Sequence, residues 1–114
     1  MAQLPRATLD EIAVLNTELL LVLDRATATA MQLYERYGEN SETQDDLDDL
    51  QVIAERARDS YSRLSTLLLR IAEAQPSANL ATMRMLNQTV ETVQANLAPS
   101  ARSIKEIKAT WSLQ

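Results

Sequence analysis

Apolar residues recur every three or four positions along almost the whole chain, and two short interruptions divide the pattern into three segments. This spacing places apolar side chains on one face of an α-helix. We therefore predict helices over residues 8–37, 42–74 and 79–112. Their apolar faces consist of Ile12, Leu15, Leu19, Val22, Ala26 and Leu33, of Leu47, Leu50, Ala54, Ala57, Tyr61, Leu64, Leu68 and Ile71, and of Met83, Leu86, Val90, Val93, Leu97, Ser100, Ile104, Ile107 and Trp111.

The ends of these segments carry residues that commonly start or stop a helix. Thr8 and Ser41 each have Glu or Gln three residues later, which is the pattern of a capping box. The third helix is expected to begin near Ser77 or Asn79. Gly38, the only glycine of the chain, lies where a helix C-terminus favours a left-handed residue.

The order of the apolar positions also predicts how the helices pack. Helices joined by short loops lie antiparallel, and the second and third apolar faces then meet rung by rung, from Ile71 with Met83 to Leu47 with Ile107. The predicted fold is all-α: residues 1–114 form a single domain, an elongated up-down-up antiparallel three-helix bundle.

Pro99 lies inside the third segment, where a proline removes one backbone hydrogen bond and crowds the preceding turn. The heptad phase continues across it without a shift, so we expect one helix that is kinked at Pro99. A break near Ala98 into two helices is the alternative.

Composition excludes several classes of function. The 114-residue chain has a net charge of −5, which disfavours binding to nucleic acid or to an anionic membrane. It has no Cys and no His, so thiolate chemistry and the commonest general base and metal ligand are missing. We expect no enzymatic activity, no cofactor and no metal. The start of the chain lacks the pattern of an export signal and residues 19–23 are too short an apolar run to span a membrane, which predicts a cytoplasmic protein.

The segment SETQDDLDDL, residues 41–50, has five acidic residues and no basic one. Acidic side chains are favoured at a helix start, because the first-turn N–H groups carry partial positive charge. In the predicted bundle this start also lies beside bases at the ends of the first and third helices. A docking surface for a basic partner and a cation site are the alternatives. The bases concerned are Arg36, Arg102, Lys105 and Lys108.

Three further groups of residues are candidates for a site. Apolar residues outside the predicted faces suggest that the protein acts as an adaptor, subunit or regulatory bundle, binding a protein partner or a second copy in a homodimer. Small residues at one level of the bundle, near Pro99, suggest either close helix packing or a cavity for a small apolar ligand, as in a carrier or sensor. Aromatic residues should meet at one end of the bundle. The three groups are Val14, Leu20, Leu21, Leu67, Leu69 and Met85; Ala26, Ala54, Ala57, Leu97 and Ser100; and Tyr34, Tyr37 and Trp111.

Overall fold

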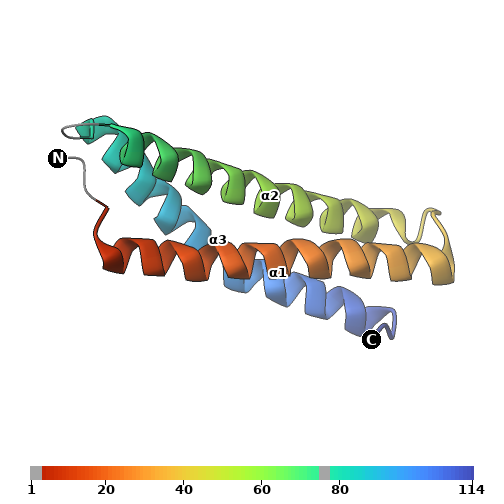
Figure 1. Ribbon diagram of the computed structural model, residues 1–114. Helices are drawn as coiled ribbons and strands as arrows, with labels where there is room; N and C mark the ends of the chain where they lie inside the picture. Colours follow the sequence, from red (N-terminus) through yellow and green to blue (C-terminus); the bar gives the residue numbers. More distant parts are fainter. Residues whose placement is uncertain (1–3, 75–77) are drawn as a thin grey trace.

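The computed structural model describes residues 4–74 and 78–114, and over these residues it contains three helices and no strand. The helices are α1 (Arg6–Tyr37), α2 (Gln44–Glu73) and α3 (Leu80–Thr110). They form an elongated bundle of 56 × 21 × 18 Å, in which α1 and α2 lie antiparallel and α3 packs against both (Figure 1). The predicted all-α, up-down-up three-helix fold is confirmed.

The core runs along the axis of the bundle, and α2 contributes a wider face to it than the sequence pattern predicts. Leu50, Ala57, Leu64 and Ile71 are buried as expected, but Ile53 and Leu67 are buried as well. The reason is that α2 packs against two helices, so a second row of side chains must also leave the solvent. The remaining residues predicted for this face are only partly buried: Leu47, Ala54, Tyr61 and Leu68.

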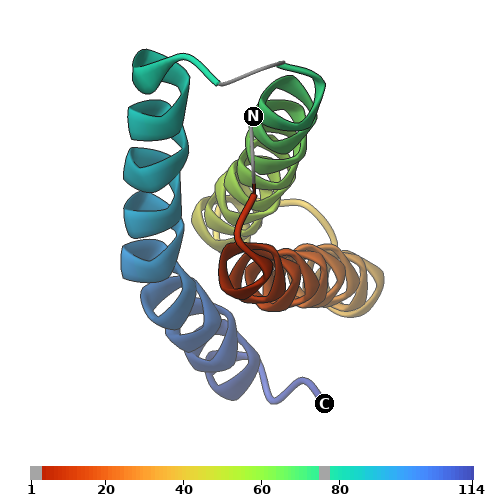
Figure 2. The same ribbon diagram turned by 60° about the vertical axis from the view of Figure 1, so that its left-hand side comes forward.

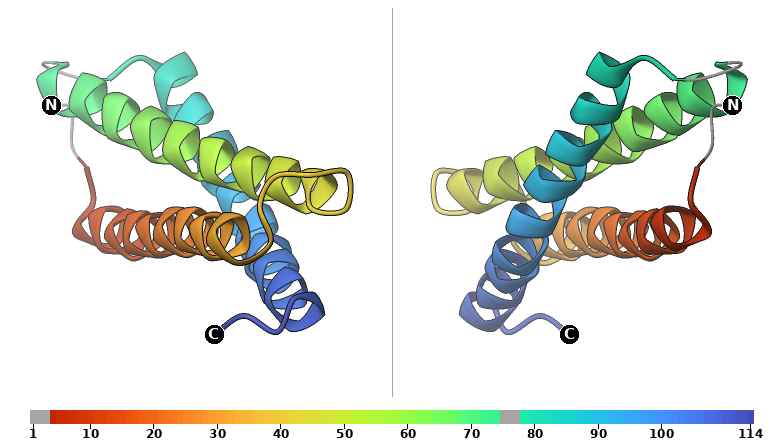
Figure 3. Two further views of the ribbon diagram at one scale, coloured as in Figure 1. Left: turned by 90° about the vertical axis from the view of Figure 1, so that its right-hand side faces the viewer. Right: turned by 90° about the vertical axis from the view of Figure 1, so that its left-hand side faces the viewer.

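α3 is antiparallel to α2, as predicted, but it crosses the α1–α2 pair obliquely (Figures 2 and 3). Two hydrogen bonds define where it crosses: Arg63 Nε donates to Thr89 Oγ1 over 3.1 Å, and Gln94 Nε2 donates to Glu11 Oε1 over 2.9 Å. The pairing of Leu47 with Ile107 at the other end of α2 stays a prediction. Leu47 is partly buried and also lines a hollow between α1 and α2.

α3 continues through Pro99 as one helix. The alternative of a break near Ala98 is therefore wrong, whereas the kink at Pro99 stays a prediction. At its start, Asn79 Oδ1 accepts the backbone N–H of Ala81 over 2.6 Å, so Asn79 is the N-cap. Ser77, the other residue considered for this role, lies outside the described residues.

Neither predicted capping box forms. α1 begins at Arg6 after Pro5, whose fixed φ suits entry into a helix, so Thr8 already lies in the first turn. α2 begins at Gln44 rather than at the residue after Ser41, because residues 41–43 form a turn.

The turn between α1 and α2 is organised by a buried hydroxyl. Thr43 is 1% exposed; its Oγ1 donates to Gly38 O over 2.8 Å and accepts the N–H of Asn40 over 3.0 Å. Gly38 has φ 76° and ψ −174°, a conformation that is essentially restricted to glycine. The positive φ expected at this position is confirmed, but ψ lies outside the left-handed helical region.

The C-terminal end of α3 lies beside the start of α2, as the sequence predicts. Trp111 Nε1 donates to Asp46 Oδ2 over 2.7 Å, and the Trp111 ring lies 5.0 Å from that of Tyr37. The expected ion pairs are absent, however: in the described part of the chain only Arg6–Asp10 and Arg58–Asp59 are ion pairs. The side chain of Arg36 instead donates to the carbonyl oxygen of Ser112 over 3.1 Å. The contact between the acidic run and the end of α3 is therefore a hydrogen bond from the Trp111 indole to Asp46, and not an ion pair.

Candidate functional site: a groove between α1 and α2

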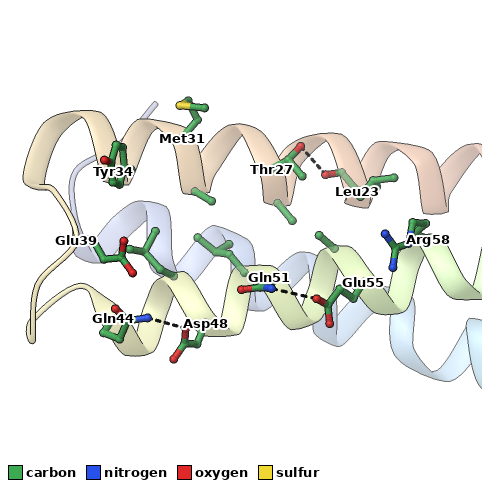
Figure 4. Close-up of a pocket in the computed structure, with 15 residues that line it drawn as sticks. Leu23, Thr27, Met31, Tyr34, Glu39, Gln44, Asp48, Gln51, Glu55 and Arg58 are labelled. Carbon is green, nitrogen blue, oxygen red and sulfur yellow. Dashed lines mark hydrogen bonds between the residues drawn. The ribbon is translucent and has the colours of Figure 1, made fainter.

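An open groove of about 580 Å³ lies between α1 and α2. It lies on the face of the α1–α2 pair that α3 does not cover, and Figure 4 shows α3 behind it. Alanines form much of its floor: Ala26 and Ala30 come from α1 and Ala54 from α2. Their short side chains leave room between the two helices that larger residues would fill.

The α1 wall of the groove is largely apolar. Leu23, Thr27, Ala30 and Tyr34 follow one another at spacings of three or four residues, so they share one edge of the helix. Met31 widens this edge. Tyr34 is 54% exposed and Met31 57% exposed, although both are large side chains. The aromatic cluster predicted at the bundle end therefore contains Tyr37 and Trp111 but not Tyr34, which lines the groove.

The α2 wall carries a row of polar side chains, of which Asp48 and Glu55 are acidic (Figure 4). Gln44 Nε2 donates to Asp48 Oδ1 over 2.8 Å. Seven residues further along the helix, Gln51 Nε2 donates to Glu55 Oε1 over 3.1 Å. Neither carboxylate forms an ion pair with a Lys or Arg of the described residues. Each therefore retains acceptor capacity toward a ligand.

The groove thus combines an apolar wall on α1 with a polar wall on α2. An apolar wall, an alanine floor and a polar rim are the features of a groove that receives an amphipathic helix. Across residues 4–74 and 78–114, no group of three or more His, Cys, Asp or Glu side chains is placed to hold a metal ion. In the same ranges no helix is both long and apolar enough to cross a membrane.

The structure does not bring the six apolar residues that the sequence singled out into one patch. Leu67 is 2% exposed and belongs to the core, so the prediction that it faces outward is wrong. Met85 is partly buried against the core. The other four are exposed, but consecutive residues of a helix point about 100° apart, and Leu21 lines a separate groove between α1 and α3. The exposed four are Val14, Leu20, Leu21 and Leu69.

The small residues predicted to share a level near Pro99 are divided between two faces of the bundle. Ala26 and Ala54 lie in the α1–α2 groove, whereas Ala57, Leu97 and Ser100 line a hollow of about 300 Å³ between α2 and α3. The floor of this second hollow is apolar and includes Leu19 and Val22 of α1. Its rim is polar and includes Arg56, Asp59, Ser60, Thr92 and Asn96.

Sequence reasoning missed the groove as a site, although a signal for it was present. Leu23, Ala30 and Tyr34 extend the apolar face of α1 to one side, and three alanines occur where that extension meets α2. A widened face predicts contact with a further helix, but it does not tell whether α3 or a partner supplies that contact.

Comparison with known proteins adds no assignment to this geometry. Neither the models of protein families, nor curated proteins, nor solved structures give a match to the chain.

Proposed function

We propose that this chain is a small, acidic, non-enzymatic interaction protein that binds a helical segment of a protein partner in the groove between α1 and α2. The observation that carries the proposal is the exposure of Met31 and Tyr34 beside an alanine floor. Large apolar side chains left in water along an open groove are typical of a binding surface. A fourth helix in this groove would complete a bundle of the four-helix type.

The proposal can be tested by removing the exposed apolar wall. A display library of helical peptides is selected on the wild-type protein, and the affinity of the recovered peptides is measured by fluorescence anisotropy. Replacing Met31 and Tyr34 together by Gln, which is a good helix former, is expected to weaken binding at least about tenfold, because apolar anchors dominate such interfaces.

The matched control is the double replacement of Val14 and Leu21 by Gln. These residues are similarly exposed on the same helix but lie outside the groove. This variant is expected to bind the same peptides within about twofold of wild type. If the Val14/Leu21 variant loses binding while the Met31/Tyr34 variant keeps it, the binding surface lies on the other edge of α1 and the groove is not the site.

A second candidate function is carriage of a small apolar ligand, and the hollow between α2 and α3 supports it. An apolar floor with a few polar groups at the rim, such as Arg56, Ser60 and Asn96, is the usual make-up of a small-molecule site. Arg56 would suit a ligand that carries an anionic group.

Native mass spectrometry of the protein purified from its source cells tests this second function. We expect a small-molecule adduct on the wild-type protein that is lost when Asn96, at the rim of the hollow, is replaced by Trp. Asn87 is also exposed on α3 but does not line the hollow, so its replacement by Trp should leave the adduct. An adduct that is absent from wild type, or that survives in both variants, argues against carriage at this place.

A further inference from the structure

We infer that the occupant of the α1–α2 groove is a basic amphipathic helix, with cationic residues along the flank that faces α2. The inference rests on the proposed function and adds the chemistry of the partner to it. Four charged side chains line the groove, and three of them are acidic: Glu39, Asp48 and Glu55, against Arg58. The charge of the groove thus lies on α2 and on the turn before it, while the α1 wall carries no charged side chain.

The acidic wall is free to pair with a ligand. Asp48 and Glu55 lie seven residues apart, which places them on one side of α2 about two turns from each other. Arg58, the base at the end of the groove, has its guanidinium 3.6 Å from the carboxylate of Asp59. No basic side chain among the residues described neutralises Asp48 or Glu55. A partner helix with Lys or Arg at the same two-turn spacing would meet both carboxylates at once.

A second copy of the chain is a poorer occupant. A two-fold pairing through this groove would use the same surface on both subunits, so each acidic wall would lie close to another one. The chain as a whole carries a net charge of −5, which adds to this repulsion. Juxtaposed like charges disfavour a partner, and complementary charges also speed the encounter with the correct one.

The dimensions of the groove define the apolar side of the occupant. From Leu23 to Tyr34 the α1 wall extends roughly 16 Å, or about three turns of helix. An occupant of this length presents large apolar residues at positions i, i+3 or i+4, and i+7. These side chains would fill the space above Ala26, Ala30 and Ala54. The partner segment is therefore expected to have one large apolar face with a cationic flank beside it.

The test uses the same display selection, with a library in which the apolar positions are fixed and each flank position is either Lys or Glu. Wild-type protein is expected to enrich Lys on one flank at least about tenfold. The double variant D48K/E55K is expected to enrich Glu on that flank instead. The control variant D45K/D49K has the same change in charge, because each replacement adds two units and the net charge rises from −5 to −1. Its mutated side chains lie outside the groove, so it should still enrich Lys.

The outcomes separate this inference from the proposed function. Peptides that depend on Met31 and Tyr34 but show no excess of Lys, or an equal loss of Lys preference in both charge variants, overturn the basic helix and leave the groove as a binding site. No groove-dependent peptide at all overturns both. A concentration-dependent dimer in analytical ultracentrifugation that disappears in the Met31/Tyr34 variant assigns the groove to a second copy and also overturns the basic helix.

Discussion

Replacement of Leu67 by alanine is expected to lower the free energy of unfolding by about 2–5 kcal/mol, the usual cost of emptying a buried leucine site. Leu67 is 2% exposed and lies beside Met85 and Arg63, where α2 meets α3. A small domain is stabilised by only about 5–15 kcal/mol in total, so this one substitution should remove a large part of the stability. Urea denaturation followed by far-UV circular dichroism measures the change.

The neighbouring Leu69 provides the matched control, since it is the same residue type on the same helix but is 62% exposed. Its replacement by alanine should alter the free energy of unfolding by no more than about 0.5 kcal/mol. A small effect at Leu67 together with a large one at Leu69 would show that α2 is rotated relative to the structure and that the outward position predicted from the sequence for Leu67 is correct.

Replacement of Pro99 by alanine is expected to stabilise the protein, by about 1–3 kcal/mol. Proline in a helix interior costs about 3 kcal/mol relative to alanine, because it cannot donate to the carbonyl four residues earlier and its ring crowds that carbonyl. That carbonyl belongs to Ala95, and both Ala95 and Pro99 are exposed on α3. Restoring the N–H therefore adds a helical hydrogen bond without placing a new side chain in the core. Thermal and urea denaturation measure the gain.

Pro5 supplies the control for this prediction. It is exposed at the N-cap of α1, where its missing N–H removes no hydrogen bond from within the helix. Both substitutions loosen the unfolded chain in the same way, so the difference between them isolates the effect on the helix. Pro5→Ala should change stability by less than about 1 kcal/mol. If Pro99→Ala instead destabilises the protein while Pro5→Ala does not, the prediction is wrong. The packing of α3 against the core then requires the helix geometry that Pro99 imposes.

Much of the fold follows from periodicity alone. Apolar residues at three- and four-residue spacings predict the three helices to within a few residues, because one face of each helix must be buried for the chain to fold. Helix starts were predicted less well. Thr8 and Ser41 match a capping pattern, but α1 begins earlier, at Arg6 after Pro5. α2 begins later, at Gln44, because the hydroxyl of Thr43 holds the preceding residues in a turn. A local motif is overridden where a neighbouring residue fixes the backbone in another conformation, by its own ring at Pro5 and by hydrogen bonds at Thr43.

The candidate site was much harder to predict, because it depends on which edge of each helix remains uncovered. Tyr34 was expected to join Tyr37 and Trp111, and Leu67 to face the solvent. The path of α3 decides both points, since it covers the edge of α2 that carries Leu67 and leaves open the edge of α1 that carries Tyr34.

By itself, the sequence determined the number of helices, their antiparallel order and the acidic character of the chain, because these depend on local spacing and on counts of residues. Only the tertiary structure decided where the groove lies and which side chains form its walls. A helix with a wide apolar face has two edges to bury, and its sequence does not tell which edge the third helix covers. The oblique crossing of α3 covers one edge and leaves the groove between α1 and α2 uncovered.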